Sequence, residues 1–429
     1  MRYLISGYYG EGNAGDEAIL AGMLQEISRR DREAAFTVLS FSPEDTLLRH
    51  ASHDSDAPPG WQGATVDGAS LGSDVPPDRY VGPDGVSHPL EAMSTSLRAP
   101  RRLRAALATT DLLISGGGSF LHEADFELHG RSFLLREGKL RPIPYFLSIV
   151  LLARAAGVPV MWYAQGLGPL HTRTARRLVA RAGSMSQAVT WRDRASAELA
   201  ERIGVRAPLQ AIVPDPAYGL RPAPASDIAG LLAEAGLSEG RRYLALCPRP
   251  WLARTAYLEN LGEALEKALA ALDMDLVLVP FHETLDPPVC ETVAARPGFA
   301  GRAHILTPPG SPAQLAAVLG AAELVIAMRL HSGILSAAAG TPAVVVDYDP
   351  KTNAFAQQTR QTQWAISVDD LETAAGAGAL LAAILGSVED LPRRRRLLEQ
   401  AVAPLRAEAG NTAQLAVQLA ASAAHGESR

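Results

Sequence analysis

The chain has 429 residues, 47% of them hydrophobic and 20% charged, with a formal net charge of −6 at pH 7. This length can supply two domains with a core each, and the composition excludes a disordered or fibrous protein. The negative charge provides no basic field for nucleic acid, and no apolar run reaches membrane-spanning length. The two cysteines, Cys247 and Cys290, cannot make a disulfide framework. We therefore expect a cytoplasmic enzyme.

The chain begins with a predicted strand at Arg2–Ser6, followed by a glycine-rich loop and an amphipathic helix. The loop has the spacing G-x-G-x-x-G, which is typical of dinucleotide binding. However, the next strand, Phe36–Phe41, lacks the acidic residue that would hold a ribose, and Asp16 and Glu17 would repel a pyrophosphate. A dinucleotide oxidoreductase is therefore disfavoured. We interpret the loop as a backbone wall with a polar tip at Asn13 and Asp16; the alternative is that the acidic pair only caps the helix.

Residues 51–98 are rich in proline, glycine, aspartate and serine and contain few aliphatic side chains. Such a composition predicts a long, flexible excursion that contributes little to a core. The regular pattern resumes with a strand that ends at Ser115 and runs into three glycines, Gly116–Gly118. Three glycines at a strand end indicate the close approach of a ligand or of another backbone.

Buried strands and helices then alternate, which predicts a doubly wound parallel sheet. The remaining strands of the first half are expected at Pro159–Gln165, Val189–Asp193 and Leu209–Val213. The stretch 219–226 has the composition of a linker, and the same alternation follows it. We thus predict an α/β protein with two domains, residues 1–220 and residues 227–429.

The second half has its most informative stretch between Ala322 and Lys351. A predicted strand ends at a turn that carries Arg329 and His331, and a helix of small residues follows. In such units ligands bind at the carboxyl ends of the strands, so a guanidinium and an imidazole beside free helix-start amides suit a small anion. The alternatives are a structural ion pair for Arg329 and a satisfied, partly buried histidine for His331.

Two other strands of this half also end in functional side chains, Arg249 on one and His282 on the next. The terminal helices are rich in alanine and are expected to pack. The basic run Arg393–Arg396 predicts a solvated face, and the alternative is a weak contact with an anionic membrane surface.

Several motifs, in the same order along nearly the whole chain, resemble the polysaccharide pyruvyl transferase family, in particular its bacterial cell-wall, CsaB-type branch. They are Gly7-Tyr-Tyr-Gly-Glu-Gly-Asn-Ala-Gly-Asp-Glu, Ile-Ser-Gly-Gly-Gly-Ser119, Ala164-Gln-Gly-Leu-Gly-Pro, Trp191-Arg-Asp, Pro214-Asp-Pro-Ala, Arg329-Leu-His-Ser and Tyr348-Asp-Pro-Lys351. The excursion at 51–98 and the stretch that begins at Phe120 depart from the family pattern.

The resemblance implies a glycosyltransferase-B-like fold, in which two Rossmann-like domains face each other across a cleft. It also implies the transfer of pyruvate from phosphoenolpyruvate to a sugar as a cyclic ketal. The implied acceptor is N-acetylmannosamine in a lipid-linked secondary cell-wall polymer precursor, and the pyruvylated polymer anchors surface-layer proteins. An association with the inner face of the membrane follows from such an acceptor.

The chemistry assigns roles to individual residues. Phosphoenolpyruvate carries a carboxylate and a phosphate, so we expect Arg249 and Arg329 to bind it, assisted by Lys351. His331 is the expected general acid to the enol methylene, with His282 as second choice. The first-domain loops are expected to hold the acceptor sugar; the residues concerned are Asn13, Asp16, Gly117 and Gln165. No cofactor or metal is expected.

Two other functions stay open. A nucleotide-sugar glycosyltransferase of the same fold would need an acidic residue that holds ribose, and Glu283 or Asp347 is available for that role. A non-catalytic protein that binds an anion or a glycan would keep Arg249 and Arg329 but would not require His331.

Overall fold

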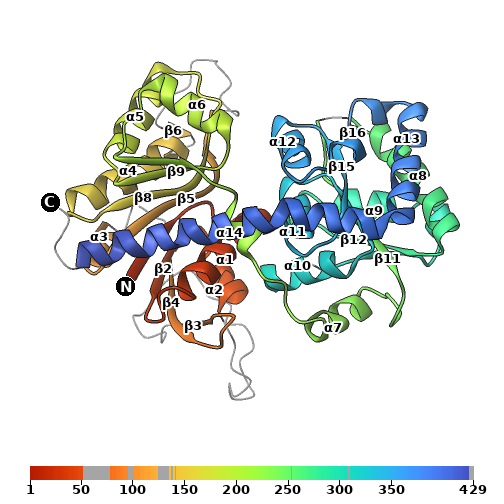
Figure 1. The fold of residues 1–429 in the computed structure, drawn as a ribbon, viewed down its shortest axis with the longest axis horizontal. Coiled ribbons are helices and arrows are strands. Elements are labelled where there is room, and N and C mark those ends of the chain that lie inside the picture. Colours follow the sequence, from red (N-terminus) through yellow and green to blue (C-terminus); the bar gives the residue numbers. More distant parts are fainter. Residues whose placement is uncertain are drawn as a thin grey trace. The chain divides into compact units, whose positions relative to one another are not determined.

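The computed structural model describes residues 1–51, 78–94, 100–123, 135–136, 139–140, 142–252, 254–307 and 310–424. Contacts within the chain divide it into two compact α/β units (Figure 1). The first comprises residues 1–10, 27–211 and the chain from 414 onward, and the second comprises residues 11–26 and 212–413.

This division differs from the predicted domains because residues 11–26 pack with the second unit. The amide of Ala14 donates to the carbonyl of Phe281 (2.8 Å), and the amide of Glu283 donates to the carbonyl of Gly12 (3.0 Å). Helix α1 (Ala14–Ser28) also packs closely against the segment that starts the second unit, since a Cβ at Gly22 would lie 2.3 Å from the carbonyl oxygen of Pro216.

In the described part of the chain, the first unit has an eight-stranded sheet in the order β10-β9-β8-β5-β1-β2-β4-β3. The strands are β1 (Arg2–Ser6), β2 (Ala35–Ser40), β3 (Asp78–Val81), β4 (Ser87–Ser94), β5 (Leu112–Leu121), β8 (Val160–Leu167), β9 (Ala188–Trp191) and β10 (Leu209–Ile212). Strands β3 and β4 pair antiparallel, whereas β1, β2, β4, β5, β8 and β9 pair in parallel. A separate short hairpin joins β6 (Leu135–Arg136) to β7 (Lys139–Leu140).

The predicted excursion at 51–98 is wrong for residues 78–94, which form β3 and β4 and extend the sheet. Tyr80, His88 and Leu90 point into the core with at most 7% exposure, and the His88 ring lies 3.1 Å from the carbonyl oxygen of Ala34. A few well-spaced apolar side chains suffice for a strand at the edge of an existing sheet, which composition alone does not reveal. The predictions for residues 52–77 and 95–99 lie outside the described residues.

Besides the end of α14 from residue 414, the described helices of the first unit are α2 (Pro43–His50), α3 (Pro100–Ala108), α4 (Pro142–Ala155), α5 (Arg173–Ser184) and α6 (Arg194–Ile203). Side chains from α3, α4, α5 and α6 share one buried cluster with strand residues such as Leu113, Trp162 and Val189, so these four helices cover the same face of the sheet. Helix α4 buries eight side chains and forms the centre of this layer.

The second unit has a six-stranded parallel sheet, within the described residues, in the order β13-β12-β11-β14-β15-β16. The strands are β11 (Tyr243–Cys247), β12 (Asp275–Leu278), β13 (Ala303–Ile305), β14 (Leu324–Ala327), β15 (Ala343–Asp347) and β16 (Ala365–Ser367). Strands β11, β12 and β14 are buried along their whole length, as expected for parallel strands covered on both faces. The order reverses direction between β11 and β14, which makes this the topological switch point of a Rossmann-type sheet.

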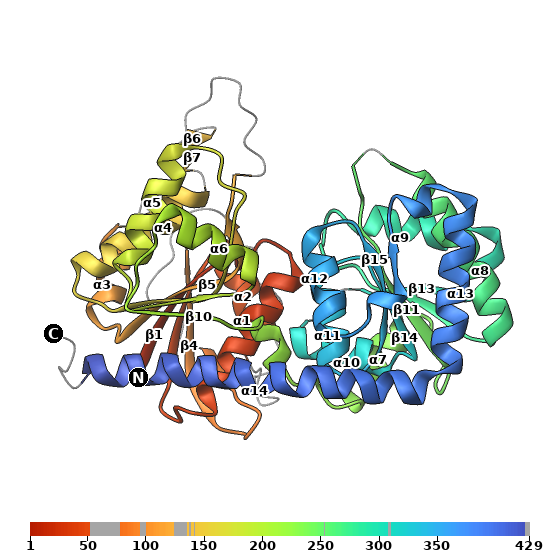
Figure 2. The same cartoon turned by 45° about the horizontal axis from the view of Figure 1, so that its top comes forward.

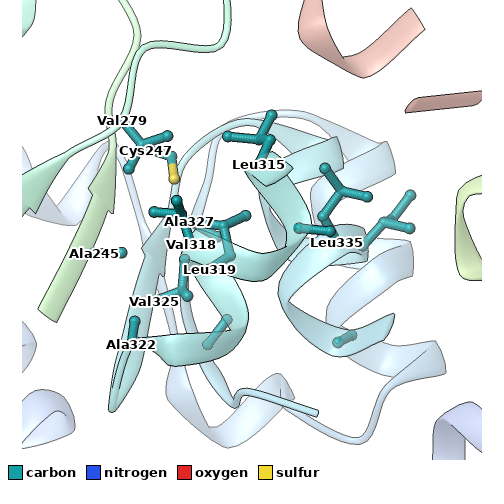
Figure 3. Close-up of a cluster of buried hydrophobic side chains, with 14 of the residues drawn as sticks. Ala245, Cys247, Val279, Leu315, Val318, Leu319, Ala322, Val325, Ala327 and Leu335 are labelled. Carbon is teal, nitrogen blue, oxygen red and sulfur yellow. The ribbon is translucent and has the colours of Figure 1, made fainter. Parts of the chain in front are cut away.

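Helices cover both faces of this sheet. Besides α1 they are α7 (Ser226–Glu234), α8 (Ala256–Leu272), α9 (Pro287–Ala294), α10 (Pro312–Ala321), α11 (Leu330–Ala338), α12 (Pro350–Gln358), α13 (Ala374–Glu389) and α14 (Leu391–Ala424). One face packs against α10 and α11, with Cys247, Leu315 and Leu335 among the buried side chains (Figure 3). The opposite face packs against α8, α9 and α13.

The basic run at the start of α14 is not a uniformly solvated face. Arg394 is only 2% exposed, its guanidinium lies 3.8 Å from the Trp364 ring centroid, and Nη2 donates to the carbonyl of Ala343 (2.7 Å). Burial lowers the pKa of Arg394 to about 9. The neighbouring arginines 393 and 395 form surface ion pairs with Asp390 and Glu323. One residue of the run is thus part of the core, because the helix turns every fourth position inward.

No single helix in the described ranges is long and apolar enough to cross a membrane. Helices α13 and α14 meet the length and composition criteria only as a pair, bent by 89°.

We predict that Gly22→Ala destabilises the second unit by about 1–3 kcal/mol, because the added methyl meets the Pro216 carbonyl oxygen in a packed interface. Urea denaturation measures the change. The matched control is Gly230→Ala on α7, where a Cβ meets nothing within 4 Å and the substitution is expected to stabilise by about 0.5–1 kcal/mol. An unchanged unfolding free energy for Gly22→Ala would mean that α1 does not pack as described.

Candidate active site

The switch point of the second sheet brings two predicted site residues to one edge. Strands β11 and β14 pair up to Cys247 and Ala327, and Arg249 and Arg329 follow these two residues at the same offset. Ligands of doubly wound sheets bind at this position, outside the carboxyl ends of the strands. The two arginines therefore start from adjacent places, but their surroundings differ.

Arg329 binds a fully buried carboxylate. Its Nε donates to Asp286 Oδ2 at 2.9 Å, and its Nη2 donates to Asp286 Oδ1. Asp286 also accepts from the amides of Phe281 and His282, each at 2.9 Å, and its exposed fraction is 0%. The bidentate pair neutralises Arg329 and directs its fork toward the protein. The sequence analysis gave two roles for Arg329, binding of an anionic ligand or a structural ion pair, and the structure shows the ion pair.

Arg249 is held by aromatic side chains instead of a carboxylate. Its guanidinium carbon lies 4.7 Å from the Tyr348 ring centroid and 5.4 Å from that of Trp251, and Nη1 donates to the Tyr348 hydroxyl at 2.8 Å. In the part of the chain that the structure describes, no carboxylate forms an ion pair with Arg249. Its positive charge is thus available to an anionic ligand, and the two rings restrict its conformations.

His331 lies in the first turn of α11 and faces a second buried carboxylate. Its Nε2 is 3.4 Å from Oδ2 of Asp215, whose exposed fraction is 3%. The other oxygen of Asp215 accepts from the amide of Ala217 at 3.0 Å, which fixes the carboxylate. The helix start itself has no side-chain cap, since its N-cap residue is Arg329. The amides of this turn therefore favour an anion beside the imidazole.

The glycine-rich loop supplies the other wall around His331. A Cβ at Gly15 would lie 2.3 Å from Nδ1 of His331, so the glycine leaves room for the imidazole. Asn13 accepts from the amide of Gly15 (3.1 Å) and donates to Asp16 (2.6 Å), which orders the loop tip. Contact with the histidine thus explains the third glycine of the spacing, whereas Gly10 and Gly12 have φ values of 77° and 69°, which favour glycine.

Asn13 and Asp16 belong to the second unit. The sequence placed them in the first domain, on the side of the acceptor sugar, and this placement is wrong. Asn13 forms a β-bridge with His282, another predicted site residue. The amide of Thr284 lies 3.3 Å from Nδ1 of His282, and burial together with the charge of Arg329 lowers the His282 pKa. His282 thus favours the neutral form, which suits a hydrogen-bonding role better than that of a general acid.

Gly117 and Gln165 remain in the first unit, so the structure does not bring them together with Asn13 and Asp16 in one unit. Gln165 is fully buried, and its Nε2 donates to the carbonyls of Gly118 (3.0 Å) and Gly166 (2.8 Å). The three glycines have φ values of 142°, 75° and 124°, and a Cβ at Gly116 would lie 2.5 Å from the Tyr163 carbonyl oxygen. The triple glycine therefore has a structural cause in the path of β5 beside β8.

The last two candidates lie on either side of the turn between β15 and α12, Asp347 at the end of the strand and Lys351 in the first turn of the helix. Lys351 is exposed, and its amide donates to the N-cap residue Asp349 at 2.8 Å. Asp347 accepts from Thr352 (2.6 Å) on one oxygen and from Asn353 (2.9 Å) on the other. Both oxygens of Asp347 are thus occupied within its own turn, which weakens its candidacy as the residue that holds a ribose.

Sequence reasoning missed Asp215 and Asp286 as site residues. Each precedes a proline at the start of a helical turn, a pattern that predicts a helix cap and gives no sign of a buried histidine or arginine partner. The motif Pro214-Asp-Pro-Ala was the only available signal. Among the described residues, no group of three or more histidine, cysteine, aspartate or glutamate side chains could hold a metal ion.

Comparison with known proteins gives a family and a fold. The family model for polysaccharide pyruvyl transferase matches residues 13–350. Anabaena HepE in complex with UDP-glucose is similar over 98% of this chain and 100% of its own, with a TM-score of 0.57 and 15% identity.

Two further solved structures are similar over nearly their whole length. A putative UDP-N-acetylglucosamine 2-epimerase from Listeria monocytogenes has a TM-score of 0.59 at 12% identity, covering 97% of this chain and 95% of its own. A glycosyltransferase from Rickettsia africae has a TM-score of 0.56 at 9% identity, covering 98% of both chains. At these identities the likeness shows the fold alone, which is of the glycosyltransferase-B type.

The different surroundings of the two arginines predict different effects on stability. Asp286→Ala leaves the partly buried Arg329 and the amides of Phe281 and His282 without their acceptor, and it should cost about 3 kcal/mol in unfolding free energy. Arg249→Ala removes aromatic contacts and a hydrogen bond to the Tyr348 hydroxyl but no ion pair with a carboxylate of the described residues, and it should cost about 1 kcal/mol. Chemical denaturation of both variants checks this, and equal losses would contradict the assignment of Arg329 to the scaffold.

Proposed function

The chain belongs to the polysaccharide pyruvyl transferase family, and on this premise we propose that it transfers pyruvate from phosphoenolpyruvate to a glycan acceptor as a cyclic ketal. The proposed acceptor is an N-acetylmannosamine unit of a lipid-linked secondary cell-wall polymer precursor. The observation that carries the proposal is the pairing of His331 with Asp215, beside an uncapped helix start and next to the strand that presents the charge of Arg249.

The donor fits this edge of the sheet by charge. Phosphoenolpyruvate has a carboxylate and a phosphate on a small, rigid enol. We assign one anionic group to the guanidinium of Arg249 and the other to the first-turn amides of α11, with Lys351 assisting the phosphate. Arg329 acts through Asp286, because this pair fixes the segment that carries Phe281 and His282.

The proposed reaction begins with a proton transfer from His331 to the methylene carbon of the donor, which becomes a methyl group. The C2 carbon then has oxocarbenium character and accepts two hydroxyl oxygens of the sugar, while the bond from C2 to the phosphate oxygen breaks. The two hydroxyl protons balance the reaction: one restores the protonated His331 and the other leaves with inorganic phosphate. A single imidazole can thus serve as acid first and as base later.

Asp215 orients His331 in this scheme. Because the amide of Ala217 fixes one of its oxygens, the other keeps a constant position 3.4 Å from Nε2 of the imidazole, at which the structure shows an ion contact and no hydrogen bond. Gly15 limits the opposite side of the ring. The imidazole is held between two elements that are distant in sequence, which favours a defined proton-transfer geometry.

A nucleotide-sugar glycosyltransferase is the second candidate, because HepE was solved with UDP-glucose on a similar fold. Of the two acids considered for ribose, Asp347 already accepts hydrogen bonds from Thr352 and Asn353. A non-catalytic glycan-binding protein would give Asp215 no role. Both alternatives differ from pyruvyl transfer in whether phosphoenolpyruvate is consumed.

We expect purified protein to release phosphate from phosphoenolpyruvate only when a carrier with an N-acetylmannosamine-containing disaccharide is present, and to do so equally with a chelator. His331→Gln should lower the rate by about 10²–10⁴-fold, the contribution of a positioned general acid.

Arg249→Ala should mainly raise the KM for phosphoenolpyruvate, because it removes the guanidinium assigned to one anionic group of the donor. Absence of phosphate release together with transfer from a UDP-sugar would favour the glycosyltransferase.

Asp215→Asn should lower kcat by about tenfold to a hundredfold, a part of the general-acid contribution, and leave the KM for phosphoenolpyruvate nearly unchanged. Steady-state kinetics with both substrates checks this. The control is Asp31→Asn in the first unit: Asp31 also accepts from a backbone amide, that of Glu33, and forms an ion pair with the amino group of Met1, and it accepts in addition from the Tyr3 hydroxyl. A KM effect alone, or equal losses of kcat in both variants, would contradict the orienting role.

A further inference from the structure

One face of the first unit carries a concentration of positive charge that contrasts with the net charge of −6 for the whole chain. Helix α3 contains three arginines, α4 contains one and α5 contains four, and none of the three helices contains an aspartate or a glutamate. The sequence from 138 to 192, which includes α4 and α5, has no acidic residue at all.

The three helices lie side by side on the same face of the sheet. Their buried side chains belong to one cluster, to which α3 contributes Leu103 and Leu107 and α5 contributes Val179. In two views of the fold, α4 lies between α3 and α5 (Figures 1 and 2). The charges of α3 and α5 therefore flank α4 on one surface.

The arginines point outward because each helix buries its opposite side. Helix α5 buries Ala175, Val179 and Ala182, so its arginines occupy the exposed positions of the same turns. The exposed arginines are Arg101, Arg102 and Arg104 on α3, and Arg173, Arg176, Arg177 and Arg181 on α5.

The helix between them presents apolar side chains to solvent. Leu151 and Leu152 on α4 are 39% and 44% exposed, although this apolar helix is otherwise largely buried. Met185, directly after α5, is 36% exposed. Adjacent exposed leucines are unusual on a surface that is otherwise rich in arginine, and both features have one common explanation.

We propose that this surface, formed by the exposed side of α3, α4 and α5, binds an anionic lipid bilayer. Arginines attract the negative surface potential of such a membrane, and aliphatic side chains enter the boundary between headgroups and acyl chains. Together they supply the two weak signals that peripheral membrane binding needs. A nucleic acid is the less suitable partner, because the exposed apolar residues are aliphatic and offer no aromatic ring for base stacking, while Tyr145 and Phe146 of α4 are buried.

The basic run at the start of α14 does not offer a comparable surface. Arg394 is buried against Trp364, and Arg393 and Arg395 form ion pairs with acidic neighbours. From the sequence, the run Arg393–Arg396 was the candidate for a membrane contact. The structure favours the surface of α3, α4 and α5 in the first unit instead. This membrane contact does not depend on the proposed reaction.

The experiment is sedimentation of the full chain with phosphatidylcholine vesicles, with and without about a third of phosphatidylglycerol, at low and at physiological salt. We expect binding only to the anionic vesicles, with an affinity that falls as salt rises. The triple variant Arg173→Gln, Arg177→Gln, Arg181→Gln should bind roughly a hundredfold more weakly, since each arginine near such a surface raises the partition coefficient about fivefold and the three factors multiply.

The matched control is the triple variant Arg393→Gln, Arg395→Gln, Arg396→Gln, which removes the same charge and should bind like the unchanged protein. The double variant Leu151→Gln, Leu152→Gln tests the apolar part and should weaken binding while the salt dependence persists. Unfolding transitions identify any variant that does not fold. The proposal is overturned by equal losses in both triple variants, by absence of binding to anionic vesicles, or by tighter binding to duplex DNA or RNA than to vesicles.

Discussion

The buried carboxylate of Asp286 is the constraint on which the second unit's functional edge depends. It accepts hydrogen bonds from Arg329, at the end of β14, and from the amides of Phe281 and His282, beyond the end of β12. Strand β11 lies between these two strands in the sheet. One desolvated carboxylate thus holds the segment after β12 and the segment after β14 in fixed positions. The free-energy cost of burying this carboxylate is offset only while all of these donors are present.

This arrangement separates two kinds of arginine that look alike in the sequence. Arg329 is neutralised and rigid, so it determines where the start of α11 and therefore His331 lie. Arg249 has no such partner among the described residues and rests against two rings. Whether an arginine stabilises the fold or is available to a ligand depends on the side chains that surround it. This cannot be derived from the fact that both follow a buried strand.

The fold could be predicted from the sequence to a large extent, because alternating buried strands and helices leave few arrangements other than a doubly wound sheet. The positions of Arg249, Arg329 and His331 at strand ends followed from the same pattern. The partners of these residues could not be predicted, since Asp215 and Asp286 read as helix caps. Local patterns also failed where the cause is long-range: Gly15 is small because a histidine over 300 residues later needs the space, and Arg394 is buried because Trp364 lies beneath it.

The assignment of residues 11–26 to the second unit and of the chain beyond 413 to the first has a consequence for synthesis on the ribosome. The polypeptide passes between the two units at residues 10, 26, 211 and 413, so neither unit is a continuous segment. The amino-terminal strand and sheet can form early, but the helix that follows β1 must wait for the second unit to emerge. The last turns of α14 complete the first unit only after the whole of the second unit has been synthesised. The first unit can therefore reach its final contacts only after the second unit has left the ribosome, although it begins the sequence.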